Sequence, residues 1–150
     1  MEVATERFTV GVFQDAVWAE RGIDALKRHN FPAEALSIIA KATPEVEALA
    51  QKAVGGANRM DVKVLGPVVA HGALVNALQR DSNGLTTRGL GASMRAIGFQ
   101  LHDGFIFEAL TSRGGVLVAV RSEARAADAL AVLHAYGGGN AAIGAWTGRV

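Results

Sequence analysis

The sequence predicts an α+β domain in which two strand-helix-strand units flank a glycine-rich helical insertion. Three observations lead to this fold class. Each end of the chain shows a strand pattern, a helix pattern and a second strand pattern; the middle is dense in glycine; and 150 residues suit one hydrophobic core. We therefore expect a single domain over 1–150, with units at 7–41 and 116–147 and the insertion at 43–113.

The first unit begins with a strand at 7–13, where Phe8, Val10 and Val12 alternate onto one face. Asp15 offers a side-chain oxygen to cap the following helix. The helix carries apolar residues at spacings of three and four, which are Ala16, Ala19, Ile23 and Leu26. Phe31-Pro32 ends it, and the apolar run at 35–41 predicts the second strand.

The second unit repeats this pattern near the C-terminus. A strand at 116–120 precedes a candidate cap, Ser122, and the glycines at 137–139 end a helix before a last strand at 141–147. The helical stripe is Ala126, Leu130 and Leu133. Sliding the chain by 107 residues places Ser122 on Asp15 and this stripe on that of the first unit, which indicates an internal repeat.

Two right-handed βαβ units in one sheet give the ferredoxin-like arrangement. It has four antiparallel strands, both helices on one face, and the first strand of each unit in the centre. If Val10, Val12, Val118 and Val120 face the helices, the other face is mostly apolar and needs a cover, either the insertion or another subunit. We therefore predict an oligomer interface at Thr9, Gly11, Phe13, Leu117 and Ala119.

The insertion reads as helical. Thr43-Pro44 is a helix start of the cap-then-proline kind, and Gly55-Gly56 ends that helix. Residues 62–79 and 86–113 then predict two helical stretches around a turn at 81–84. Glycine is costly inside helices, so its frequency here indicates close helix packing or breaks, and we expect kinks near Gly98 and Gly104.

Composition excludes several classes of function. A formal charge of +1 lacks the basic field of a nucleic-acid-binding protein. The absence of cysteine excludes thiol catalysis, disulfides and thiolate metal sites. The first ten residues lack the basic flank and apolar stretch of a signal peptide, so we expect a cytoplasmic protein. The apolar stretch 62–78 is interrupted by Lys63, Pro67, His71 and Asn76, which disfavours a membrane contact.

Two sets of polar residues are candidates for binding. His71, His102 and Glu108 form a candidate metal set, although they lack a ligand spacing, and an enzymatic site around His71 and His102 stays open. His102, Asp103 and Arg121 form a candidate ligand set for a small molecule. No serine lies in a nucleophile elbow and no glycine run matches a phosphate loop, so we predict no catalytic residue and no cofactor.

Three stretches resemble the bacterial general-stress or heat-induced stress protein domain family. They are the strand-turn-helix start with Ala19-Glu20 before Phe31-Pro32, the run LGPVVAHGAL at 65–74, and RGGVLVAV at 113–120. The chain departs from that family in a short glycine-rich stretch at 54–58 and in FQLHD at 99–103. The resemblance implies a stress-linked, non-enzymatic role and carries over no catalytic residue.

These observations favour a non-catalytic, homo-oligomeric, stress-associated protein. Its low content of charged residues, 19%, leaves much uncharged surface, which promotes self-association. A small-molecule-binding module that uses the oligomer interface is the first alternative, and a metal or enzymatic site is the second.

Overall fold

A computed structural model describes residues 8–80, 84–121, 125–137 and 147–149, and the statements below concern those ranges. One antiparallel sheet has the strand order β3-β4-β2-β5-β1-β6. The strands are β1 Phe8–Phe13, β2 Leu36–Lys41, β3 Asn58–Val62, β4 Gly66–His71, β5 Val116–Arg121 and β6 Thr147–Arg149. The helices are α1 Ala16–Arg28, α2 Pro44–Val54, α3 Ala73–Gln79, α4 Gly84–Arg88, α5 Leu90–Ala96, α6 Leu101–Ser112 and α7 Ala126–Ala135, with a 3-10 turn at Ala33–Ala35.

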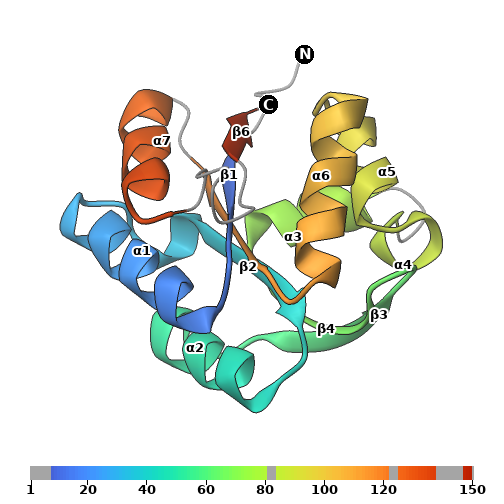
Figure 1. Ribbon diagram of the computed structural model, residues 1–150, viewed down its shortest axis with the longest axis horizontal. Coiled ribbons are helices and arrows are strands. Elements are labelled where there is room, and N and C mark those ends of the chain that lie inside the picture. The colour runs from blue at the N-terminus through green and yellow to red at the C-terminus, as the bar shows by residue number, and fades with distance from the viewer. Residues whose placement is uncertain (1–7, 81–83, 122–124, 138–146, 150) are drawn as a thin grey trace.

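The sheet lies between two groups of helices. Figure 1 shows α1, α2 and α7 on one side and α3, α4, α5 and α6 on the other. Each group encloses its own apolar cluster against one face of the sheet. The predicted α+β class is therefore confirmed, and the chain order includes the segments β1-α1-β2 and β5-α7-β6.

The predicted four-strand sheet and purely helical insertion are wrong, because the insertion contributes β3 and β4. The stretch predicted as helix at 62–79 contains the end of β3, all of β4 and only then α3. Its valines are β-branched and favour strands, and Pro67 opposes a helix. A short apolar run cannot by periodicity alone be assigned to strand or helix, which explains the error.

The predicted helix starts are confirmed. Asp15 accepts a hydrogen bond from the Trp18 amide at 2.9 Å, and the Thr43 hydroxyl accepts one from the Val46 amide at 3.1 Å. Pro44 occupies the first turn of α2, where its missing N–H is not needed. The predicted cap Ser122 and most of the predicted strand at 141–147 lie outside the described residues.

The prediction of which sheet residues face the helices of the two units is confirmed for β5 and wrong for β1. Val118 and Val120 face α1 and α7 as expected. Val10 pairs with Ala119 and Val12 with Leu117, and these pairs share the face covered by α3 to α6. Since all six residues of β1 are buried, its alternation carried no information about which face each residue takes.

The five residues of the predicted oligomer interface do not lie at the surface of the single chain. Thr9, Gly11, Phe13, Leu117 and Ala119 are all buried within it. Of the two covers considered, the insertion is the one found, because its helices α3 to α6 enclose Leu117 and Ala119. A second copy could reach these residues only if the chain opened.

Glycine has two different roles around α6. Gly98, at φ 121°, lies in the break between α5 and α6, which confirms the interruption expected there. Gly104 lies inside α6, which continues through it, so the expected kink is absent. A Cβ at Gly104 would lie 2.7 Å from the Gly91 carbonyl oxygen. Glycine here lets α5 and α6 approach closely.

Replacing Gly104 with alanine tests this contact. Helix propensity alone would stabilise the variant by up to ~1 kcal/mol. Crowding against the Gly91 backbone should outweigh that gain and lower the free energy of unfolding by about 1–3 kcal/mol. Urea unfolding of Gly104→Ala measures the difference, and Ala109→Gly on the exposed side of α6 measures propensity alone. A Gly104→Ala variant as stable as the parent would contradict the close contact.

Candidate functional site

The residues of the predicted metal set do not come together. His71 pairs with Ile38, whose side chain lies in the cluster under α1 and α2. Paired residues of an antiparallel ladder share a face, so His71 lies on that face. His102 and Glu108 belong to α6, which packs on the opposite face. Within the described ranges, no three His, Asp or Glu residues are grouped so as to hold a metal ion.

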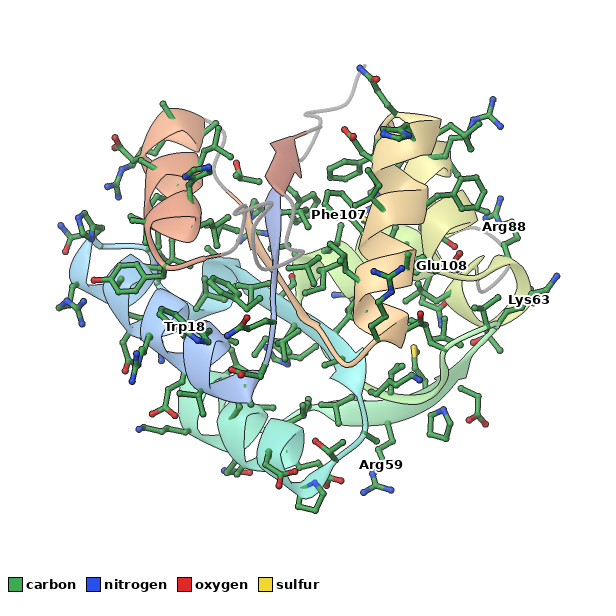
Figure 2. All side chains as sticks on the ribbon, viewed as in Figure 1. Trp18, Arg59, Lys63, Arg88, Phe107 and Glu108 are labelled. Carbon is green, nitrogen blue, oxygen red and sulfur yellow. The ribbon has the colours of Figure 1, made fainter. Side chains whose placement is uncertain are left out.

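Glu108 has a structural partner. Its Oε2 accepts a hydrogen bond from the Gly91 amide at 3.4 Å, in the first turn of α5. Gly89, at the N-cap of α5, provides no side-chain cap, and a Cβ there would lie 3.0 Å from the same oxygen. Figure 2 shows Glu108 on the same side of the molecule as Arg88 and Lys63. The carboxylate thus supplies the negative group that a helix start favours.

Arg121 of the predicted ligand set lies on the same side of the sheet as the helix that carries His102 and Asp103. Arg121 pairs with Phe8, which belongs to the cluster under α3 to α6, so Arg121 lies on the α6 face of the sheet. Because α6 joins β5 through a short turn, the start of α6 lies at the same end as the end of β5 (Figure 1). His102 is exposed there, and Asp103 and Arg121 are half-buried.

A small depression lies between α2 and the β3-β4 hairpin. Its volume is about 130 Å³, below the range of about 300–1,000 Å³ typical of ligand pockets. It is lined by Glu47, Ala50, Gln51, Gly56, Ala57, Arg59 and Val69. Arg59 forms an ion pair with Glu47 at its rim. A water or small ion fits this space better than a metabolite.

The edge of the sheet at β3 is a feature that the sequence predictions missed. Among the described residues, β3 pairs with β4 alone, and Asn58, Arg59 and Asp61 are exposed along it. In Figure 2, Arg59 extends outward at the margin of the molecule. A weak signal was available: Asn58 to Val62 follows Gly55-Gly56 and precedes Gly66-Pro67, both turn signals that bound a strand. Assigning the whole stretch after 62 to helix hid that signal.

One clear electrostatic perturbation occurs within the described residues. Lys52 donates a hydrogen bond to the Glu20 carboxylate, and this bond raises the pKa of Lys52. Lys27 Nζ also donates to the Ala53 carbonyl at 2.6 Å. Both contacts join α1 to α2, so they support packing rather than chemistry.

Within the described residues, no helix is long and apolar enough to cross a membrane. The chain matches no protein-family model, no curated protein and no solved structure. The geometry and the sequence of the chain itself therefore indicate its function.

Replacing Glu108 with alanine separates a capping role from a metal-binding role. Loss of the cap should lower the free energy of unfolding by about 0.5–1 kcal/mol. Thermal unfolding with Zn²⁺ and with a chelator provides the measurement. If Zn²⁺ stabilised the parent, and Glu108→Ala and His102→Ala both removed that effect, the capping role alone would be insufficient.

Proposed function

We propose that this chain is a non-catalytic protein that works as a homo-oligomer. One observation carries the proposal, namely that β3 is an edge strand of the sheet in the described part of the chain, where Asn58, Arg59 and Asp61 are exposed. An edge strand presents unpaired N–H and C=O groups, which favour pairing with another chain. Both faces of the sheet are covered, so self-association uses an edge or a helix surface.

The dispersion of the candidate chemical groups supports a non-catalytic role. Acid-base or metal chemistry needs two or more groups within hydrogen-bond or ligand distance of one reacting atom. Here the carboxylate of Glu108 interacts with the start of α5, and His71 lies on the other side of the sheet from His102. These groups therefore serve packing better than catalysis.

The same proposal includes a ferredoxin-like core and a link to stress physiology. The strands β2-β5-β1-β6, with α1 and α7 on one face, follow the ferredoxin-like order, and β3 and β4 extend that sheet. The link to stress depends on the motif resemblance alone. Of its stretches, 65–74 includes β4 and the start of α3, and 113–120 includes most of β5.

Light scattering coupled to size exclusion tests the oligomer. We expect a mass of twice 15.6 kDa or more at high protein concentration, with dissociation on dilution. A short strand-to-strand contact buries less area than a permanent interface, so reversible association in the micromolar range is expected. A mass of one chain at every concentration up to the millimolar range would contradict the proposal.

A second candidate function is the binding of a small anionic molecule at Arg121. The observation favouring it is that Arg121 lies on the face of the sheet that α6 covers, at the end of the sheet where α6 begins. A guanidinium binds carboxylate and phosphate groups well. This role is compatible with an oligomer.

Thermal unfolding against a panel of phosphorylated and carboxylated metabolites tests this second function. We expect at least one compound to raise the midpoint by several degrees in the parent protein and to lose most of that effect in Arg121→Gln. Arg113→Gln, a change at an exposed arginine at the other end of β5, is the matched control. An unshifted midpoint with every compound would argue against the site.

A further inference from the structure

The direction of the backbone along β3 follows from one hydrogen bond. The Ala42 amide donates to the Pro67 carbonyl at 3.1 Å, so the carbonyl of Pro67 points toward β2 and away from β3. Pro67 lies opposite Asp61, and it has no N–H to donate. Asp61 and Pro67 therefore form a non-hydrogen-bonded pair, in which the N–H and C=O groups of each residue point away from the other strand.

It follows that Asp61 directs its N–H and C=O outward from the edge of the sheet. Arg59, two residues earlier on the same strand, does the same, whereas the backbone of Met60 points inward to β4. The outer edge thus offers the donors and acceptors of Arg59 and Asp61. These are the two charged residues of β3, and they have opposite signs.

A second copy of β3 fits this edge in one antiparallel register. When Met60 lies opposite the Met60 of the second copy, Arg59 lies opposite its Asp61, and Asp61 opposite its Arg59. Both are hydrogen-bonded pairs, since the N–H and C=O groups of Arg59 and Asp61 point outward from the edge in each copy. Shifting the register by two residues either way puts Arg59 opposite Arg59 or Asp61 opposite Asp61. Like charges directly opposite are destabilising.

The side chains are placed to make these cross-strand contacts. Arg59 pairs with Val69 in the cluster under α2, so Arg59 and Asp61 share the α2 face. The Arg59 side chain is 65% exposed although it is paired with Glu47, which leaves its guanidinium able to bind a second carboxylate. Met60 packs partly against the other cluster, on the opposite face.

We infer that β3 pairs with β3 of a second copy about a two-fold axis through Met60. The result is one continuous sheet across two molecules, with a Glu47, Arg59 and partner-Asp61 ion network on each side of the axis. The inference rests on the proposed homo-oligomer and names its interface. The charges select the register, and the backbone groups supply most of the contact.

Charge reversal tests the register. Arg59→Glu and Asp61→Lys should each weaken the dimer by about tenfold or more, since each places like charges opposite one another twice. An equal mixture of the two variants should form a mixed dimer in which each cross-strand pair has opposite charges. The double variant, Arg59→Glu with Asp61→Lys, should dimerise like the parent. Glu47→Gln, which removes only the ion pair within one chain, should keep the dimer. Circular dichroism checks the fold of each variant.

Disulfide trapping provides a second measurement. The chain has no cysteine, so Met60→Cys gives a single thiol on the two-fold axis. Opposite residues of a non-hydrogen-bonded pair lie about 4.5 Å apart at Cα, within the range that a disulfide spans. We expect rapid oxidation to a dimer for Met60→Cys and slow oxidation for Phe105→Cys, a change at an exposed position on α6.

The outcomes separate the two proposals. A parent protein that stays monomeric contradicts both the homo-oligomer and the β3 interface. The parent could instead be a dimer while the mixed variants form no dimer and Met60→Cys forms no disulfide. That result overturns the β3 interface and leaves the homo-oligomer proposal intact. Rescue together with trapping supports both.

Discussion

The burial of one sheet on both faces by its own chain is the constraint on which the structure depends. The central strands β1 and β5 are almost entirely buried, and apolar clusters lie on either side of them. Polar groups in such an interior need partners. Ser37 shows this: its hydroxyl accepts a hydrogen bond from the Leu74 amide at 3.0 Å, which satisfies one donor at the start of α3 and fixes that helix over β2.

The second helical layer is possible because small residues let its helices approach each other. Gly91 and Gly104 bring the backbones of α5 and α6 into contact, and Phe107 of α6 then reaches the sheet, with its ring edge-on to Phe99. Figure 2 shows Phe107 directed from α6 toward the sheet. The density of glycine in this segment therefore reflects packing as well as breaks, and it explains how an apolar sheet face is hidden without a second subunit.

Two-sided burial also determines where this protein can interact. When helices cover both faces of a sheet, a partner can contact the edges of the sheet, the outer surfaces of the helices or the ends of the strands. At β3 the edge carries exposed charges of both signs, and Arg121 ends β5 on the face of the sheet that α6 covers. The candidate sites thus lie at the margins of the sheet. Only the first of them combines the edge of a sheet with self-complementary charges.

The starts of α1 in the first unit and of α2 in the insertion could be predicted from the sequence, because local signals determine them. Asp15, Thr43 and Pro44 act through bonds within their own turn, so the starts of α1 and α2 follow from a few adjacent residues. The facing of β1 and the strands β3 and β4 could not be predicted in this way. A strand buried on both faces has no alternation, and the partner of an apolar segment is decided by residues far along the chain. Tertiary structure alone placed Arg59 and Asp61 on an open edge, because only pairing with β4 sets the direction of their backbone groups.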